Sequence, residues 1–166
     1  MSVRRLTRGA LLTTIALTIF MLEAQIPAPV PIPGIKLGLA NIVTIFALYA
    51  LGPTQAMLIL IARCTLGAVF AGNLNALLFS LMGGLSAMLV MIGLSRLRRL
   101  SIYGVSMGGA AAHNCGQVAA AMVTLGNAAP LAYLPVLLAV SLLSGTLTGY
   151  LSGLLFRALE QTGLMK

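Results

Sequence analysis

Apolar runs with almost no charge fill most of this sequence, and they constrain its fold more than any other feature. Hydrophobic residues make up 60% of the chain, charged residues only 7%, and the mean hydropathy is +1.06. A soluble globular domain carries about 25% charged residues, so this composition is typical of a protein that is embedded in a lipid bilayer. The chain is therefore predicted to be an integral membrane protein.

Breaks at glycine, proline and basic residues divide the apolar sequence into six segments that fit membrane-spanning helices. Such a helix needs about 20 apolar residues, and the runs lack the alternation of membrane β-barrel strands. The second segment is short, so five spans are the alternative. We expect an all-α bundle of six transmembrane helices in one domain, residues 1–166. The predicted spans are residues 7–26, 37–51, 54–72, 75–94, 102–126 and 131–156.

The basic residues predict which way the bundle faces, because short cytoplasmic loops collect Lys and Arg. Of the 10 basic residues, 8 fall before the first span, between the fourth and fifth, or after the sixth, which lie on one side of the membrane. They are Arg4, Arg5, Arg8, Arg96, Arg98, Arg99, Arg157 and Lys166. Both termini are therefore predicted to be cytoplasmic. These short clusters between apolar runs do not resemble the basic face of a nucleic-acid-binding protein.

Polar side chains gather in the half of the spans that is predicted to face outward. Polar groups in one leaflet are costly unless they face protein or water, so this pattern indicates a cavity that opens to the outside. Cationic groups there favour an anionic or carbonyl-rich solute, and amides can orient it by neutral hydrogen bonds. The candidate substrate-binding residues are Glu23, Lys36, Asn41, Arg63, His113, Asn114 and Gln117.

Structural roles remain open for several of these residues. Glu23 and Arg63 have the charges for an ion pair with each other, and Lys36 has the length to extend to the membrane interface without touching a ligand. Any single amide is equally suited to a hydrogen bond between helices. Interfacial or capping roles are expected for a second group of amides, namely Gln25, Asn73, Asn75 and Asn127.

Small residues recur at four-residue spacing and predict close contacts between helices. One stripe runs from Gly104 to Ala120 and another from Ser141 to Gly153, both suited to packing inside the bundle. A third small face, Ala10, Thr14 and Thr18, lacks an obvious internal use and suits a partner protein. Cys64 and Cys115 both lie in apolar runs, which favours packing over a disulfide.

Several kinds of site are absent from the sequence. It has no phosphate-binding GxxxxGK[ST] loop, so an ATP-driven process needs an ATPase on another chain. His113 and the two cysteines lack the spacing of a zinc site, and the glycine-rich "SMGGAAAHN" does not follow a strand as a dinucleotide-binding loop does. We therefore predict no metal, no cofactor and no catalytic residue.

Two motifs, "PIPGIKLGLANIVT" (residues 31–44) and "GAAAHNCGQVAAA" (residues 109–121), carry a family resemblance over nearly the whole chain. In this order on six short spans, they resemble the Gx transporter family, which is also labelled heptaprenyl diphosphate synthase component I. The resemblance implies a fold similar to the substrate-binding S components of energy-coupling factor transporters. It also implies a multi-pass protein of the bacterial plasma membrane with its pocket in the outer half.

The two family labels point to different functions. The transporter label implies uptake of a vitamin-like or isoprenoid-related solute together with a transmembrane coupling subunit and ATPase subunits. Prenyl chain elongation needs aspartate-rich motifs to hold magnesium on a diphosphate, and this chain has no aspartate. The synthase label is therefore compatible only with a non-catalytic accessory subunit, and a membrane scaffold is a further alternative.

Overall fold

A computed structural model describes residues 3–23, 25, 38–72, 74–97 and 99–161 of the chain. Within these residues the fold is all-α, with six α-helices, one short 3₁₀ helix and no strand, so the predicted fold class is confirmed. The helices are α1 (Val3–Glu23), α2 (Ala40–Leu51), α3 (Pro53–Ala71), α4 (Leu74–Ser95), α5 (Ile102–Leu125), η1 (Ala129–Tyr133) and α6 (Leu134–Gln161).

Glycine and proline set several helix ends as the sequence indicated, and a serine caps another. Gly52 has a φ of 90° and separates α2 from α3, whose first residue is Pro53. Gly72 and Gly126 end α3 and α5 in the left-handed conformation, which glycine adopts without strain. Ser101 caps the start of α5 by accepting a hydrogen bond from the Gly104 backbone at 3.4 Å. Helices α3, α4 and α5 begin and end within one residue of the segments 54–72, 75–94 and 102–126.

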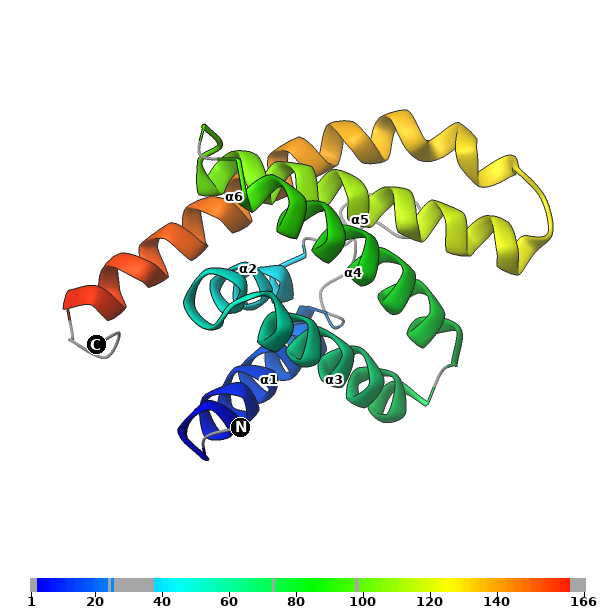
Figure 1. The fold of residues 1–166 in the computed structure, drawn as a ribbon. Helices are drawn as coiled ribbons and strands as arrows, with labels where there is room; N and C mark the ends of the chain where they lie inside the picture. The colour runs from blue at the N-terminus through cyan, green and yellow to red at the C-terminus, as the bar shows by residue number, and fades with distance from the viewer. Residues whose placement is uncertain (1–2, 24, 26–37, 73, 98, 162–166) are drawn as a thin grey trace.

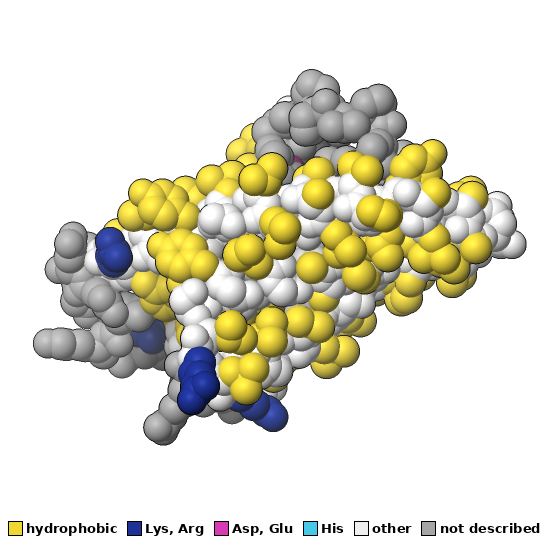
Figure 2. Space-filling model, turned by 90° about the horizontal axis from the view of Figure 1, so that it is seen from above, with side chains coloured by type: hydrophobic (Ala, Val, Ile, Leu, Met, Phe, Trp, Pro, Cys, Tyr) yellow, Lys and Arg dark blue, Asp and Glu magenta, His cyan; other side chains and the backbone are white. Residues whose placement is uncertain are grey.

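Length, composition and surface identify a multi-pass membrane protein. Four segments are long and apolar enough to cross a bilayer, namely Leu6–Glu23, Pro53–Ala71, Leu74–Ser95 and Ala129–Ala158. Large apolar side chains cover the outside, where Val69, Phe70 and Leu143 are 71%, 63% and 75% exposed. Figure 2 shows one such apolar face, with Lys and Arg confined to one end of it. Lipid accounts for this exposure better than water does.

Two helices differ from these four. The helix α2 has 12 residues and rises about 18 Å, well short of a hydrocarbon core of about 30 Å. The helix α5 is long enough at 24 residues, but polar residues such as His113 and Asn114 interrupt its apolar sequence. Membrane crossing by α2 and α5 stays a prediction.

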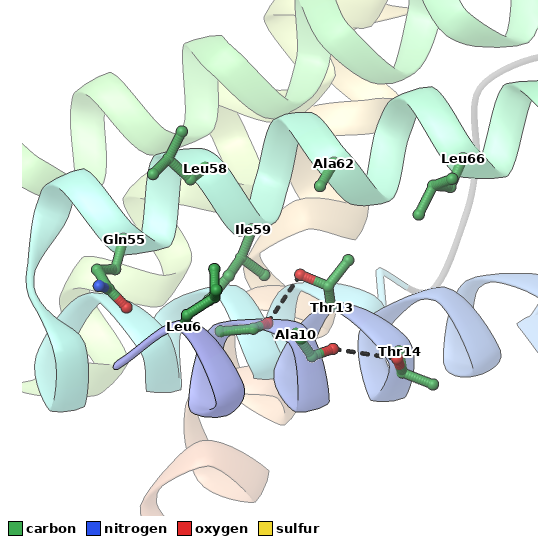
Figure 3. A pocket seen from close by; sticks show the side chains of 10 residues that line it. Leu6, Ala10, Thr13, Thr14, Gln55, Leu58, Ile59, Ala62 and Leu66 are labelled. Atoms are coloured by element: carbon green, nitrogen blue, oxygen red, sulfur yellow. Dashed lines mark hydrogen bonds between the residues drawn. The ribbon is translucent and has the colours of Figure 1, made fainter. Parts of the chain in front are cut away.

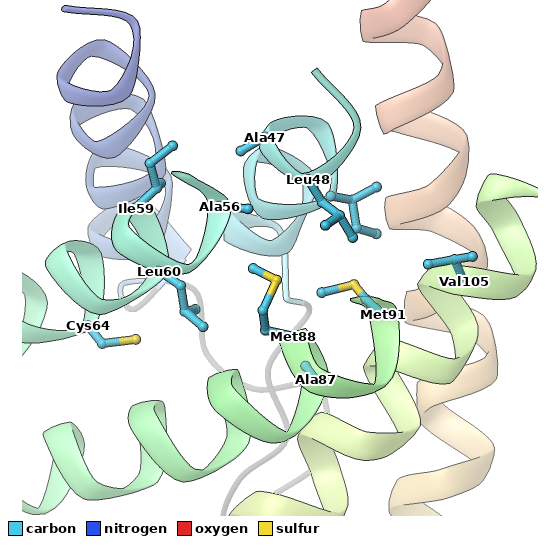
Figure 4. Packing of buried hydrophobic residues seen from close by; sticks show 11 residues of the cluster. Ala47, Leu48, Ala56, Ile59, Leu60, Cys64, Ala87, Met88, Met91 and Val105 are labelled. Carbon is cyan, nitrogen blue, oxygen red and sulfur yellow. The ribbon is translucent and has the colours of Figure 1, made fainter. Parts of the chain in front are cut away.

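The helices form two groups that meet at α2 and where α3 packs against α4. Helices α4, α5 and α6 lie side by side in chain order, whereas α1 and α3 pack together on the other side, and α2 touches α1, α3 and α6 (Figure 1). The main core joins side chains of α2, α3, α4 and α5, with Leu60 and Met88 at its centre, both almost fully buried (Figure 4). The start of α1, the α4–α5 connection and the end of α6 lie toward the left of Figure 1, and the α3–α4 and α5–η1 connections toward its right.

The glycine stripes of α5 and α6 lie inside the bundle, as predicted. A Cβ atom at Gly116 would fall on the backbone carbonyl oxygen of Met82 in α4, and one at Gly145 would lie 2.7 Å from Met107 Cα in α5. Ser106 and Thr148 add a buried hydroxyl–hydroxyl hydrogen bond of 2.8 Å between α5 and α6. The stripes therefore bring the backbones of α4, α5 and α6 close together.

The structure also shows where the third small face and the two cysteines lie. Ala10, Thr14 and Thr18 are exposed on α1, so this third small face points out of the bundle. Cys64 is buried, Cys115 is exposed, and the structure has no disulfide between them.

Candidate functional site

One buried polar cavity gathers five of the seven predicted site residues. Glu23 at the end of α1, Asn41 in the first turn of α2 and Arg63 in the middle of α3 line it from one side. His113 and Gln117 of α5 line it from the other. The cavity has a volume of about 30 Å³, which is room for about one water molecule. The sequence thus identified most of a real cluster, although the cavity is smaller than an organic solute.

Glu23 is held by the chain itself. Its Oε1 accepts a hydrogen bond of 2.6 Å from the backbone N–H of Gly38, two residues before α2, and the residue is 8% exposed. A carboxylate near a helix start is favoured by the helix dipole. The carboxylate of Glu23 thus holds the backbone just before α2. Among the described residues, Glu23 forms no ion pair with Arg63, and its Oε1 bonds Gly38.

Arg63 is a buried cation without a described hydrogen-bond partner for its Nε. The residue is 6% exposed, and its guanidinium carbon lies 5.9 Å from the centre of the Phe20 ring. Gly67, one turn later on α3, makes space for that ring, since a Cβ there would lie 2.8 Å from Phe20 Cε1. A cation–π contact compensates only part of the cost of burying a charge. The Nε–H is therefore available to an acceptor in the cavity.

His113 and Gln117 lie one turn apart on α5 and reach the cavity because Gly83 of α4 has no side chain. A Cβ atom at Gly83 would lie 2.9 Å from both Gln117 Cγ and His113 Cε1. Gln117 is 5% exposed, and its Oε1 has no hydrogen-bond partner among the described residues. Buried amide oxygens are normally paired, so this acceptor is an exception that a ligand or water would satisfy.

Asn114 forms a hydrogen bond between two helices, and the sequence did not predict its partner. Its Nδ2 donates to the backbone carbonyl of Leu137 at 2.8 Å and ties α5 to α6. It lines a second cavity of about 20 Å³, which shares Gly38, Asn41 and His113 with the first. Asn114 is thus beside the polar cavity and not in it, and a role in binding stays a prediction. Lys36, the seventh candidate, lies outside the described residues.

Sequence reasoning missed three hydroxyl residues around the cavities. Ser80 of α4 lines the first cavity, and Ser144 and Thr148 of α6 line the second. Serine and threonine are common in packed membrane helices, so nothing local sets these three apart. Asn127 Oδ1 accepts from the Ala129 N–H at 3.0 Å, a local side-chain turn just before η1.

A larger groove between α1 and α3 has a different character. It has a volume of about 380 Å³ and is lined mainly by small and apolar side chains, including Ala10 and Thr14 (Figure 3). The hydroxyl groups of Thr13 and Thr14 bond carbonyl groups of their own helix, so they are already satisfied. Among its lining residues Gln55 alone has an amide or charged side chain. Convergent polar groups mark a solute site, and these lie in the smaller cavity.

The Glu23–Gly38 bond predicts a loss of stability when its carboxylate is removed. Glu23→Leu is expected to lower the free energy of unfolding by about 1.5–3 kcal/mol, the usual worth of a charge-assisted hydrogen bond. Glu23→Gln keeps an acceptor oxygen and should lose less. Thermal unfolding of the detergent-solubilised variants measures both. A Glu23→Leu variant as stable as the unchanged protein would contradict a stabilising role of the Glu23–Gly38 bond.

Comparison with known proteins gives one result. A family model described as heptaprenyl diphosphate synthase component I matches residues 12–155, which include most of the chain and every residue of the polar cavity. No curated protein matches the chain. No solved structure matches it either.

Proposed function

Because the chain belongs to the heptaprenyl diphosphate synthase component I family, we propose that this membrane protein captures a small polar solute in the cavity that Arg63 and Gln117 line. One observation carries the proposal. Arg63 and Gln117 line the same cavity, and Arg63 Nε and Gln117 Oε1 are buried with no hydrogen-bond partner among the described residues. Polar groups at membrane depth are retained mainly where they serve a function or a partner.

The cavity is reached from the outer face in this proposal. The exposed arginines Arg8, Arg96, Arg99 and Arg157 lie at the start of α1, in the α4–α5 connection and near the end of α6. The positive-inside rule assigns this end to the cytoplasm. Glu23 is the last residue of α1, at the other end of that helix from Arg8, and Asn41 is in the first turn of α2, which follows it in the chain. In this proposal both residues belong to the outer end of the bundle. A solute from outside therefore meets the cavity in the outer half of the bundle.

Transport from this cavity needs an energy source on other chains. We propose that a transmembrane coupling subunit and ATPase subunits supply it, as in the energy-coupling factor systems that the motifs resemble. The solute is a vitamin-like or isoprenoid-related compound in this hypothesis, and the protein itself performs no chemistry.

The family description favours a second candidate function, a non-catalytic membrane subunit of heptaprenyl diphosphate synthesis. The words "component I" imply a partner component. The chain has no aspartate with which to hold magnesium on a diphosphate, so catalysis would belong to that partner. In this alternative the polar cavity has a structural role only.

Native mass spectrometry of the purified protein tests the solute-binding function. We expect the unchanged protein to retain a defined small molecule and the Arg63→Met/Gln117→Leu double variant to lose it. The matched control is Arg157→Met/Gln55→Leu, which makes the same two changes outside the cavity and should retain the molecule. Size-exclusion chromatography and thermal unfolding show whether each variant is folded.

Two outcomes would count against solute capture. Lipid alone on the unchanged protein would favour the accessory-subunit alternative. A small molecule that the folded cavity variant retains as well as the control does would place binding elsewhere on the protein.

A further inference from the structure

The polar cavity and an apolar one share a lining residue. The apolar cavity has a volume of about 70 Å³ and lies between α4, α5, η1 and α6, where Phe79, Tyr133 and Leu137 line it. Gln117 is the one residue that the described linings of both cavities share. Its side chain has several rotatable bonds, and the ligand inferred below requires it to turn so that the two spaces connect.

The unsatisfied atoms define the polar end of a ligand. Arg63 Nε–H is a donor and calls for an acceptor, whereas Gln117 Oε1 is an acceptor and calls for a donor. A ligand that satisfies both presents an acceptor beside a donor. Amides, ureides and lactams have this arrangement on one edge, whereas a carboxylate has acceptors only and an ammonium group has donors only.

The charges on the described cavity wall favour a neutral ligand. Glu23 and Arg63 are 8% and 6% exposed, and their formal charges cancel. A charged ligand would leave a net charge in a buried space, which costs more than a neutral one. Phosphate and other dianions are the least favoured, because they would lie in the same small cavity as the Glu23 carboxylate.

We infer that the solute is a neutral amphipathic molecule, with an amide-type edge held between Arg63 and Gln117 and an apolar body in the cavity beside Phe79. This inference rests on the proposed solute-binding function. It narrows the substrate class to compounds that pair one donor–acceptor edge with a short hydrophobic part.

The absence of tryptophan from the sequence makes a direct test possible. Phe79→Trp places a single fluorophore in the wall of the apolar cavity, and Phe70→Trp places one on the exposed surface of α3 as a control. The probes are 6-bromohexanamide, 6-bromohexanoate and 6-bromohexylammonium, whose bromine quenches tryptophan on contact. The three probes have similar brominated six-carbon chains, so a difference in quenching between them reports on the head group.

We expect 6-bromohexanamide to quench Trp at position 79 at about tenfold lower concentration than either charged probe, the effect of one well-made buried hydrogen bond. At position 70 the three probes should differ only by their partition into detergent. Adding Gln117→Leu to the Phe79→Trp variant should abolish the amide preference. If Phe79→Trp does not fold, Tyr133→Trp provides a reporter on the same cavity.

Two results would overturn the inference. Equal or stronger quenching at position 79 by a charged probe would exclude the neutral amide class. The same order of quenching at positions 79 and 70 would exclude a tail in the apolar cavity. Either result leaves solute capture standing if native mass spectrometry finds a molecule that the Arg63→Met/Gln117→Leu variant loses.

Discussion

Gly116→Ala is expected to be among the most destabilising single-methyl additions in the bundle. The added Cβ atom would fall on the backbone carbonyl oxygen of Met82 and near the hydroxyl of Ser86, both in α4. A backbone oxygen cannot rotate away as a side chain does, so α4 and α5 have to separate. Overpacking of this kind costs about 1–3 kcal/mol, and loss of contacts along the neighbouring turns adds to it.

The control for this prediction is Gly93→Ala in α4. A Cβ atom at Gly93 meets nothing within 4 Å, and alanine favours a helix over glycine by about 1 kcal/mol. We expect Gly93→Ala to unfold at the same temperature as the unchanged protein or above it, and Gly116→Ala well below it, in the same detergent. Equal unfolding temperatures for the two variants would show that α4 and α5 are not closely packed at Gly116.

Local sequence signals predicted the elements of this fold well because the breakers act locally. Gly52-Pro53, Gly72 and Gly126 end or begin helices through their own backbone preferences, so the bounds of α3, α4 and α5 follow from a few residues. The small-residue stripes are also a local signal, because small residues at four-residue spacing allow two helices to pack closely. Neither signal depends on how distant parts of the chain are placed.

The candidate site was predictable in membership but not in geometry. Polar and charged side chains are costly to bury, so Glu23, Arg63 and Gln117 stand out as candidates in an apolar chain. The structure brings these three residues to one cavity. The partners of Glu23 and Asn114 could not be foreseen, because they bond backbone groups of Gly38 and Leu137, which any sequence provides. A hydrogen bond to a backbone group cannot be predicted from the type of residue that provides the group.

Gly83 is a second case in which the role depends on tertiary structure. In the sequence it is half of a Gly83-Gly84 pair in an apolar run, which indicates helix packing. In the structure it faces the side chains of His113 and Gln117 and gives them room to enter the polar cavity. The three atoms nearest to a Cβ at the neighbouring Gly84 belong to Leu60, a core residue of α3. The two glycines are therefore expected to respond differently to substitution.

Gly83→Ala is expected to remove ligand binding while the bundle stays folded. The new Cβ atom would lie 2.9 Å from Gln117 Cγ and from His113 Cε1, so both side chains have to shift. Side chains move at lower cost than a backbone, and the better helix propensity of alanine offsets about 1 kcal/mol of that cost. A displaced Gln117 Oε1 no longer aligns with a ligand held by Arg63, which should weaken binding by about tenfold or more.

Gly83→Ala and Gly116→Ala together separate the two roles of glycine in this protein. Binding of the small molecule found by native mass spectrometry, titrated against each variant, should fall for Gly83→Ala and hold for Gly93→Ala. Thermal unfolding should rank them differently, with Gly116→Ala far less stable than either. A Gly83→Ala variant that binds as tightly as Gly93→Ala would mean that Gln117 and His113 do not hold the solute. Alanine at position 83 of α4 displaces both side chains, so binding through either of them should weaken.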